Sequence, residues 1–378
     1  MATSGSRPLR VMLCAVVLAC ASGCTPGRPA APAASGRSDT PTAVGATDGD
    51  FCKVELPATW KQALTDGKVA HQKGEALQIV TAAEDGTLFV DAFAAGTRSV
   101  QRIRGGERTT VMRLADEDAQ VFDATFDGRW LVFSVQDEPT LDSTFGYYAW
   151  DSSGATPAHR IGQSTTKGGP WPNPVLLDGR AFWTISISES ASQLHMTDLA
   201  SGADKVIREG IPNTPFRFGD LVAWNEMDPR YDAMTLVAAT PATGAVVALP
   251  AELRTPVARP ATFNGDQQTV VWAANQNRLR VWRKGAPEPV TVIAHPPAGT
   301  RVEWPSITGD HVGWDNGDAM LLGDLRTRSY TQVTPTAGSL VARNGVVIVG
   351  YAPTGKDRHP VREWTVVKTS ALPQLPAC

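Results

Sequence analysis

A glycine turn recurs seven times along the chain at similar spacing, and this recurrence limits the folds that the chain can adopt. In each instance a short strand pattern ends at an Asp-Gly, Gly-Asp or Asn-Gly pair, and an apolar run follows. Asp-Gly and Asn-Gly favour tight hairpins because both central positions of such a turn need positive φ. The seven glycines are 36–51 residues apart and are Gly86, Gly128, Gly179, Gly219, Gly265, Gly309 and Gly345. The period predicts seven copies of one structural unit.

Two further features recur with the same phase. A proline precedes the glycine by four or five residues in four repeats, where it can start a strand without removing a ladder hydrogen bond; these are Pro174, Pro215, Pro260 and Pro305. After the second strand come a third apolar strand, a small turn and a short fourth strand, as in 194–207 and 236–249. Four short strands in about 40–45 residues is the size of a propeller blade. We therefore predict an all-β chain, with a seven-bladed β-propeller of four-stranded antiparallel blades over residues 51–378.

Large aromatic residues stand late in the second strand of five repeats. They are Phe133, Trp183, Trp224, Trp272 and Trp314. Because propeller blades stack face to face around an axis, we interpret these rings as packing between blades. A ring of sugar-stacking aromatics is the functional alternative.

The repeat also carries a family resemblance. An Asp-Gly turn and an apolar strand, followed by a strand–Asp-x-x-x-Gly–strand unit such as Asp198–Gly202, resembles the TolB-like and WD-type bacterial propellers over residues 52–378. The Trp-Asp pairs at 150–151 and 314–315 lack the Gly-His of eukaryotic WD repeats, so that subfamily is not indicated. The tryptophans also stand in a different repeat context from those of quinone-cofactor propellers, so no cofactor is expected.

The two ends of the repeat region predict how the ring closes. The seventh unit has strand patterns only at 339–343, 346–351 and 363–369, while the strand pattern 51–56 precedes the first unit. We expect 51–56 to complete the last blade, because an open ring would leave two unpaired edges. Cys52 and Cys378 would then lie together, and we predict a disulfide between them.

The first residues predict export. Arg7 and Arg10 precede a neutral apolar run over 11–21, which is typical of a secretory signal and too short to span a bilayer. The run ends in Ala21-Ser22-Gly23-Cys24, which resembles a bacterial lipoprotein box with lipidation at Cys24. A competing box ends at Cys20, and an ordinary secretory signal with unmodified cysteines is the other alternative. Residues 1–23 are therefore expected to be a lipoprotein signal peptide.

Residues 24–50 are predicted to be a disordered tether, because Pro, Ala, Gly, Ser and Thr dominate and such a segment buries little apolar surface. Removal of residues 1–23 changes the formal charge from −3 to −5. A mildly acidic body is attracted neither to nucleic acid nor to anionic lipid headgroups. We therefore expect an extracytoplasmic protein that contacts the bacterial cell membrane through its lipid anchor only, with no nucleic-acid partner.

The sequence shows no catalytic constellation. The six histidines fall in different repeats or loops, without metal-ligand spacing. A Gly-x-Ser-x-Gly nucleophile elbow is absent, as is a phosphate-binding glycine loop between a strand and a helix. We predict no catalytic residues, no metal and no cofactor.

Acidic loops and two tryptophans mark one face of the predicted ring. Loops between second and third strands share a propeller face with the connections between blades, and the candidate residues on it are Asp137, Glu138, Asp142, Trp171, Glu226, Asp228, Asp232, Trp304 and Asp315. The alternative interpretation is a set of solvated loops that keep the ring soluble. The prediction is a monomeric binding or scaffold module for a protein or glycan of the cell envelope. The alternative function is a propeller enzyme, a lactonase or a glycan-cleaving enzyme, with carboxylates in its channel.

Overall fold

The computed structural model describes residues 51–138, 143–154, 156–164, 170–188, 190–258, 262–275, 278–293, 302–352 and 362–378. The signal peptide, Cys24, the tether and Asp142 lie outside the described residues. Within these ranges no helix is both long and apolar enough to cross a membrane.

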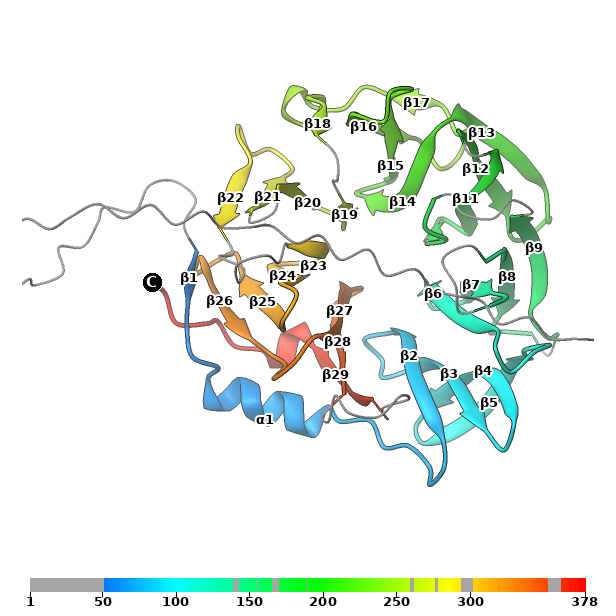
Figure 1. The fold of residues 1–378 in the computed structure, drawn as a ribbon, viewed down its shortest axis with the longest axis horizontal. Helices are drawn as coiled ribbons and strands as arrows, with labels where there is room; N and C mark the ends of the chain where they lie inside the picture. The colour runs from blue at the N-terminus through cyan, green and yellow to red at the C-terminus, as the bar shows by residue number, and fades with distance from the viewer. Residues whose placement is uncertain are drawn as a thin grey trace, which may run out of the picture. The chain divides into compact units, whose positions relative to one another are not determined.

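Seven sheets follow one another in sequence order around a common axis (Figure 1), which confirms the seven-bladed β-propeller. Blade 1 contains β2 (Ala76–Ala82), β3 (Leu88–Ala94), β4 (Thr97–Arg104) and β5 (Glu107–Arg113). Blade 2 contains β6 (Gln120–Phe126), β7 (Trp130–Gln136), β8 (Phe145–Asp151) and β9 (His159–Ser164). Blade 3 contains β10 (Val175–Leu177), β11 (Arg180–Ser188), β12 (Ala191–Asp198) and β13 (Asp204–Gly210).

The next two blades repeat this antiparallel order. Blade 4 contains β14 (Pro212–Phe218), β15 (Leu221–Met227), β16 (Ala233–Ala239) and β17 (Val246–Val247), and β18 (Val257–Ala258) pairs with β16. The 3₁₀ helix η1 (Ala251–Leu253) joins β17 to β18. Blade 5 contains β19 (Phe263–Gly265), β20 (Thr269–Asn275), β21 (Arg278–Arg283) and β22 (Val290–Ile293).

The last two blades hold the closure of the ring. Blade 6 contains β23 (Glu303–Thr308), β24 (His311–Asp315), β25 (Met320–Asp324) and β26 (Ser329–Gln332). Blade 7 contains β27 (Gly338–Arg343), β28 (Val346–Tyr351) and β29 (Glu363–Lys368), and the 3₁₀ helix η2 (Thr369–Ala371) follows.

The N-terminal segment closes the ring differently from the prediction for 51–56. Its strand β1 (Cys52–Lys53) does not complete blade 7 but adds, in parallel, to β26 at the outer edge of blade 6. The chain then passes blade 7, where Lys68 bridges Thr365 of β29 and Val69 donates its amide to the Trp364 carbonyl at 2.9 Å. The fourth position of blade 7 is thus occupied by backbone near Lys68.

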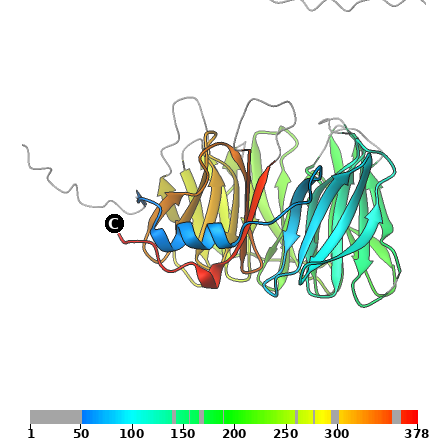
Figure 2. The ribbon, with the colours of Figure 1, turned by 90° about the horizontal axis from the view of Figure 1, so that it is seen from below.

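A helix and a disulfide hold this closure. In α1 (Ala58–Asp66), the indole of Trp60 is fully buried against blades 6 and 7, and its Nε1 donates to the Pro373 carbonyl at 2.7 Å. Cys52 and Cys378 form the predicted disulfide, with Cα atoms 5.8 Å apart. Figure 2 shows α1 and the C-terminal segment lying side by side across the outside of blades 6 and 7. The two ends of the described chain therefore clasp the last blades together.

The core is divided among the contacts between blades. Each neighbouring pair shares an apolar cluster, for example Trp130 and Val132 of blade 2 with Leu176 and Trp183 of blade 3. The five late aromatics of the second strands are buried in these clusters, with at most 4% exposed. Their interpretation as interblade packing is confirmed.

Six of the seven predicted glycines have positive φ in the first turn of their blade, as a tight hairpin requires. The exception is Gly265, which ends β19, so that the turn of its blade follows over residues 266–268. A Cβ at Gly265 would come within 2.7 Å of the Arg217 carbonyl oxygen in blade 4. This glycine is therefore needed for close approach of two blades rather than for its φ.

Candidate functional site

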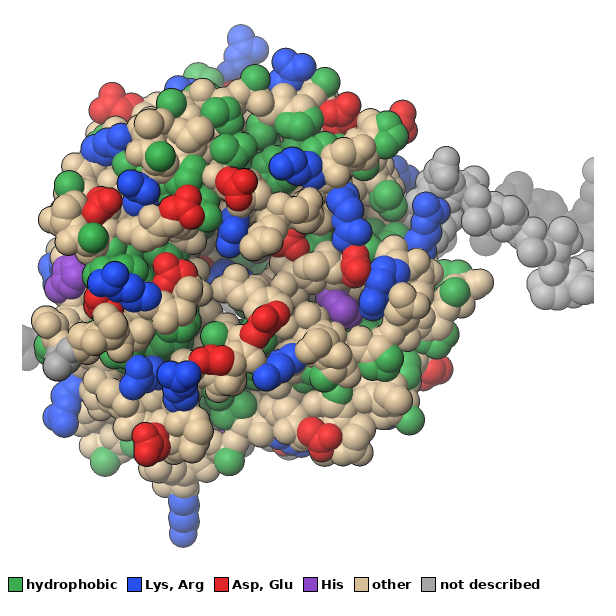
Figure 3. Space-filling model, turned by 180° about the vertical axis from the view of Figure 1, so that it is seen from behind, with side chains coloured by type: hydrophobic (Ala, Val, Ile, Leu, Met, Phe, Trp, Pro, Cys, Tyr) green, Lys and Arg blue, Asp and Glu red, His purple; other side chains and the backbone are tan. Residues whose placement is uncertain are grey.

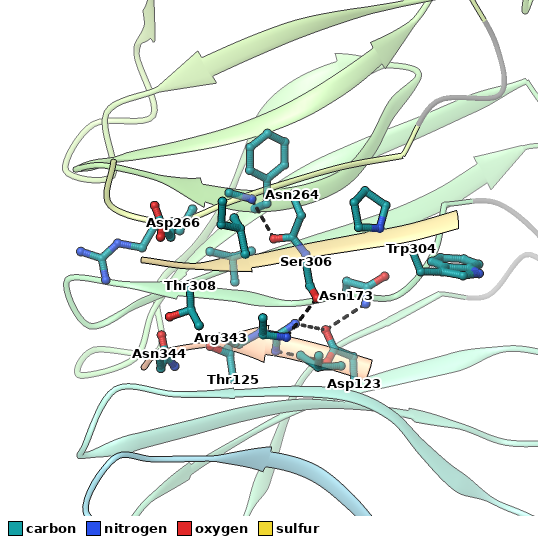
Figure 4. A pocket seen from close by; sticks show the side chains of 18 of the residues that line it. Asp123, Thr125, Asn173, Asn264, Asp266, Trp304, Ser306, Thr308, Arg343 and Asn344 are labelled. Atoms are coloured by element: carbon teal, nitrogen blue, oxygen red, sulfur yellow. Dashed lines mark hydrogen bonds and ion pairs between the residues drawn. The ribbon is translucent and has the colours of Figure 1, made fainter. Parts of the chain in front are cut away.

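The innermost strands of all seven blades surround a central cavity of about 1640 Å³. These strands are β2, β6, β10, β14, β19, β23 and β27. In Figure 4, Trp304 lies at one end of the cavity, Asp266 and Asn344 lie at the other, and Asp123 and Arg343 lie between them. The cavity is the axial channel of the propeller.

The two ends of the channel open on different faces. The loop face carries the connections between blades and those between second and third strands, so all the candidate residues that the structure describes belong to it. The turn face carries the glycine hairpins and η2, which lies at the lower side in Figure 2. Seen from behind, the molecule carries basic and acidic side chains interspersed around a narrow depression (Figure 3), with no extended field of one sign. That surface does not select a strongly charged partner.

A polar cluster crosses the middle of the channel. The guanidinium of Arg343 in β27 lies 3.2 Å from both carboxylate oxygens of Asp123 in β6 and also donates to the Ala124 carbonyl. The side-chain amide of Asn173 donates to Asp123 at 2.9 Å (Figure 4). Blade 7 is thereby joined to blade 2 across the channel, although blade 1 stands between them in the ring. The charges of Arg343 and Asp123 neutralise each other and leave little attraction for a charged ligand.

The carboxylate at the turn-face end is also engaged in the fold. Asp266 accepts the backbone amides of Gln268 and Thr269 at 2.8 Å in its own turn, and that of Gly309 in blade 6 at 2.7 Å. Such capping stabilises the turn and links two blades. Asp266 is therefore a structural carboxylate.

Two tryptophans meet across the channel at the loop face. The rings of Trp171, before β10, and Trp304, in β23, contact each other edge to face, with centroids 5.2 Å apart. Trp171 also stacks on Phe122 of β6 at 5.4 Å. Blades 3 and 6 are not neighbours in the ring, so this contact bridges the mouth of the channel. The structure thus brings together the two tryptophans that the sequence analysis placed on this face.

Trp304 stands out in two ways. Its side chain is 44% exposed, and its backbone φ is +50°, in the left-handed region that bulky residues rarely adopt. The pairing of β23 with β24 also shifts register between Glu303 and Ser306. An exposed aromatic ring on a strained backbone at a cavity mouth is a feature of functional sites.

Asp315 lines the same cavity, at the end of β24 and opposite Glu303 of β23. Burial raises the pKa of its carboxyl, and Glu303 and Asp318 raise it further, while the Gly317 amide bonds to it at 2.6 Å and opposes the shift. A half-buried carboxyl at the channel wall can accept hydrogen bonds from a ligand.

The remaining acidic candidates do not line the cavity. Glu226 is bound by Arg208 of β13 through contacts of 2.6–2.9 Å and also accepts Trp224 Nε1 at 3.3 Å. Its hydrogen bond raises the pKa of Arg208. Asp228 accepts the amides of Asp232 and Ala233 within its loop. Glu226 therefore joins blades 3 and 4 rather than pointing to a partner.

Two other acidic residues lie on the loop after β7. Asp137 accepts the hydroxyl of Thr144, while the backbone amide of Glu138 donates to Ser143 Oγ at 2.9 Å. Both side chains are exposed, as is that of Asp232. These carboxylates stand on the rim of the loop face, away from the tryptophan pair.

Sequence reasoning missed the polar residues that line the channel. Asp123, Asn173 and Arg343 form the cluster inside the channel, and Asn225 of β15 lies at the channel wall with only 3% exposed. A charged or amide residue inside an otherwise apolar strand was the signal that could have found them. Among the residues described, no group of three His, Cys, Asp or Glu side chains is placed to hold a metal ion.

Comparison with known proteins bears on the fold. No family model matches the chain, and no curated protein matches its sequence. Among solved structures it is similar to a prolyl endopeptidase, with a TM-score of 0.54 and 9% identity over 83% of this chain and 51% of that one. The chain therefore spans about half the length of that peptidase.

Two other solved structures match with lower TM-scores. The extracellular domain of BT4673 from B. thetaiotaomicron matches with a TM-score of 0.49 and 9% identity, over 79% of this chain and 40% of that one. YCF48 from Cyanidioschyzon merolae matches with a TM-score of 0.49 and 14% identity, over 80% and 98%. At 9% identity, the likeness to the prolyl endopeptidase shows the fold alone.

Proposed function

We propose that this protein is a lipoprotein of the bacterial cell envelope, anchored through Cys24, whose propeller binds an envelope protein or glycan at the loop face. One observation carries the proposal: the exposed Trp304 meets Trp171 over the open end of a channel of about 1640 Å³. Ligand sites are typically concave, with aromatic walls and a few polar groups. The anchor is expected to keep the ring at the membrane surface.

The alternative function is an enzyme with paired channel carboxylates. Hydrolysis by two carboxyl groups needs one of them free to act as acid and the other as base or nucleophile. Asp123 is paired with Arg343, and Asp266 caps turns, so neither is free for this role. Asp315, whose pKa burial raises, is the channel carboxyl on which this alternative depends. The engagement of Asp123 and Asp266 favours a binding module.

Site-specific photo-crosslinking in cells tests the binding face. A photoreactive phenylalanine analogue at Ile187, 50% exposed at the loop-face end of β11, should give one discrete adduct. The matched control is Val246, 55% exposed on the outer strand β17 of blade 4. Equal adducts at both positions, or none at Ile187, would reject the loop face as the binding face.

The anchor is tested separately. Metabolic labelling with a fatty acid should mark the wild-type protein, and Cys24→Ala should abolish the label. Retention of label by Cys24→Ala together with its loss in Cys20→Ala would move the lipidation site to Cys20.

A further inference from the structure

The inner wall of the loop-face mouth contains polar groups whose hydrogen bonds the fold leaves unmade. Asn225 is 3% exposed, and its Oδ1 has no hydrogen-bond partner among the described residues. The hydroxyl of Thr262, just before β19, is likewise buried without a partner there. Both residues line the channel. Buried polar groups are normally satisfied, so each such group requires an explanation.

These two residues belong to one interface. Within β15, Asn225 alternates with Ala223 and Met227, which pack in the apolar cluster shared by blades 4 and 5. Side chains two residues apart on a strand share a face. Asn225 is therefore directed toward blade 5, the blade to which Thr262 belongs.

The tryptophan pair bounds this part of the channel. Because Trp171 belongs to blade 3 and Trp304 to blade 6, their contact separates the mouth over blades 4 and 5 from the mouth over blades 7, 1 and 2. The first compartment has an aromatic wall on one side and the Asn225 and Thr262 side chains on the other. Asp315 lies outside this compartment, because it shares a face of β24 with Gly313, which lies against Leu340 of blade 7.

We propose that this compartment, formed by Trp304, Trp171, Asn225 and Thr262, binds an uncharged oligosaccharide. This assignment rests on the proposed binding function of the loop face and names its ligand class. The aromatic faces cover the C–H faces of sugar rings, and the amide and hydroxyl groups exchange hydrogen bonds with sugar hydroxyls.

The charge of the channel supports an uncharged ligand. The four residues of the compartment carry no formal charge, so neither an anionic nor a cationic ligand finds an opposite charge among them. Deeper in the channel, Arg343 is paired with Asp123, and Asp266 is bound by three backbone amides. The compartment is one part of a channel of about 1640 Å³, which exceeds the size of typical small-ligand pockets.

Ligand-observed NMR and calorimetry on the mature protein test the proposal. The probes are chitotetraose, cellotetraose, maltotetraose and mannotetraose, with tetralysine as the charged comparison. We expect one oligosaccharide to bind, and Trp304→Ala to weaken its binding by about tenfold or more, as expected for loss of an aromatic anchor. Val246→Ala removes an exposed apolar side chain outside the channel and should leave binding unchanged.

Asn225→Leu separates a ligand contact from a structural role. Leucine has a similar size and leaves no unpaired polar atom, so the melting temperature should stay the same or rise. Oligosaccharide binding should nevertheless fall by about tenfold, which corresponds to one lost hydrogen bond. The matched control is Thr331→Val in β26, because Thr331 Oγ1 is also buried without a partner among the described residues but does not line the channel. Like Asn225→Leu, Thr331→Val should keep or raise the melting temperature, but it should leave oligosaccharide binding unchanged.

Three results would overturn the proposal: no binding of any oligosaccharide, binding of tetralysine instead, or unchanged affinity in both Trp304→Ala and Asn225→Leu. If a loop-face adduct at Ile187 still forms under any of these results, the loop face remains a binding face and only the ligand class is wrong. If the Ile187 adduct is also absent, the proposed function fails as well.

Discussion

The ring closure and the channel mouth both depend on tryptophans, but the closure buries its indole, whereas the mouth leaves one exposed. At the closure, Trp60 is fully buried, its Nε1 is hydrogen-bonded, and a disulfide joins the adjacent segments. At the mouth, Trp304 is 44% exposed on a left-handed backbone, and the buried Oδ1 of Asn225 has no partner among the described residues. The closure is therefore built from buried, hydrogen-bonded groups, whereas the mouth leaves an aromatic ring and a polar atom available to the ligand that we propose.

The largest effect is expected from truncation at the closure. Trp60→Ala removes the indole that fills the space between α1 and blades 6 and 7, and should lower the free energy of unfolding by about 4 kcal/mol. Denaturant unfolding measures it. Trp60→Phe, which keeps a ring but loses the bond to Pro373, should have a smaller effect. If Trp60→Ala lowered the free energy of unfolding by less than Trp304→Ala does, the contrast between the closure and the mouth would be wrong.

The disulfide comes next. The double variant Cys52→Ser/Cys378→Ser should lower the free energy of unfolding by about 3 kcal/mol, below the chain-entropy limit of about 5–6 kcal/mol, because blade packing already holds the ring closed. Thermal unfolding with and without reductant measures it. The double variant should show no response to reductant, which serves as the control.

The ion pair in the channel should have a smaller effect. Arg343→Met leaves the Asp123 carboxylate with only the Asn173 amide. It should destabilise the protein by about 2 kcal/mol, less than for a fully buried pair, because the two side chains are 25% and 10% exposed. Arg343→Met combined with Asp123→Asn should regain part of the loss. An additive double variant would show that the two groups are not coupled.

His311 makes the closure sensitive to acid. It is buried near Trp60, with ring centroids 5.9 Å apart, and burial lowers its pKa below the ordinary 6.5, with Asp310, Asp324 and Arg326 acting in opposing senses. The unfolded chain therefore takes up a proton more readily than the folded protein. Stability should be complete above pH 6.5 and should fall as the pH drops below it, by at most about 1.4 kcal/mol per pH unit. His311→Phe should remove this part of the slope, and an identical pH profile in the variant would refute it.

The smallest effect is expected at the mouth. Trp304→Asn loses an exposed side chain and places at φ +50° a residue that tolerates the left-handed region. The free energy of unfolding should change by less than about 1 kcal/mol, in either direction. A loss comparable with that of Trp60→Ala would make Trp304 a structural residue and remove the distinction between the two regions.

The sequence determined the blade count, the burial of Trp183 and Trp224, and the pairing of Cys52 with Cys378, because turn chemistry and apolar periodicity act locally and recur seven times. It also placed Trp171 and Trp304 on one face, since strand order alone decides which ends of the strands share a face.

Only the tertiary structure decided which residues meet across the ring. Arg343 reaches Asp123 in blade 2, and Trp171 touches Trp304 of a non-adjacent blade, through contacts that no repeat encodes. The tertiary structure also decided that β1 pairs with β26 of blade 6. The blade edge that a short strand joins depends on which edge lies nearby and on the path of α1, rather than on the sequence of the strand itself. From the sequence, Glu226 is a free acidic residue of the loop face. In the structure Arg208 of blade 3 binds it, and this ion pair depends on how blades 3 and 4 pack.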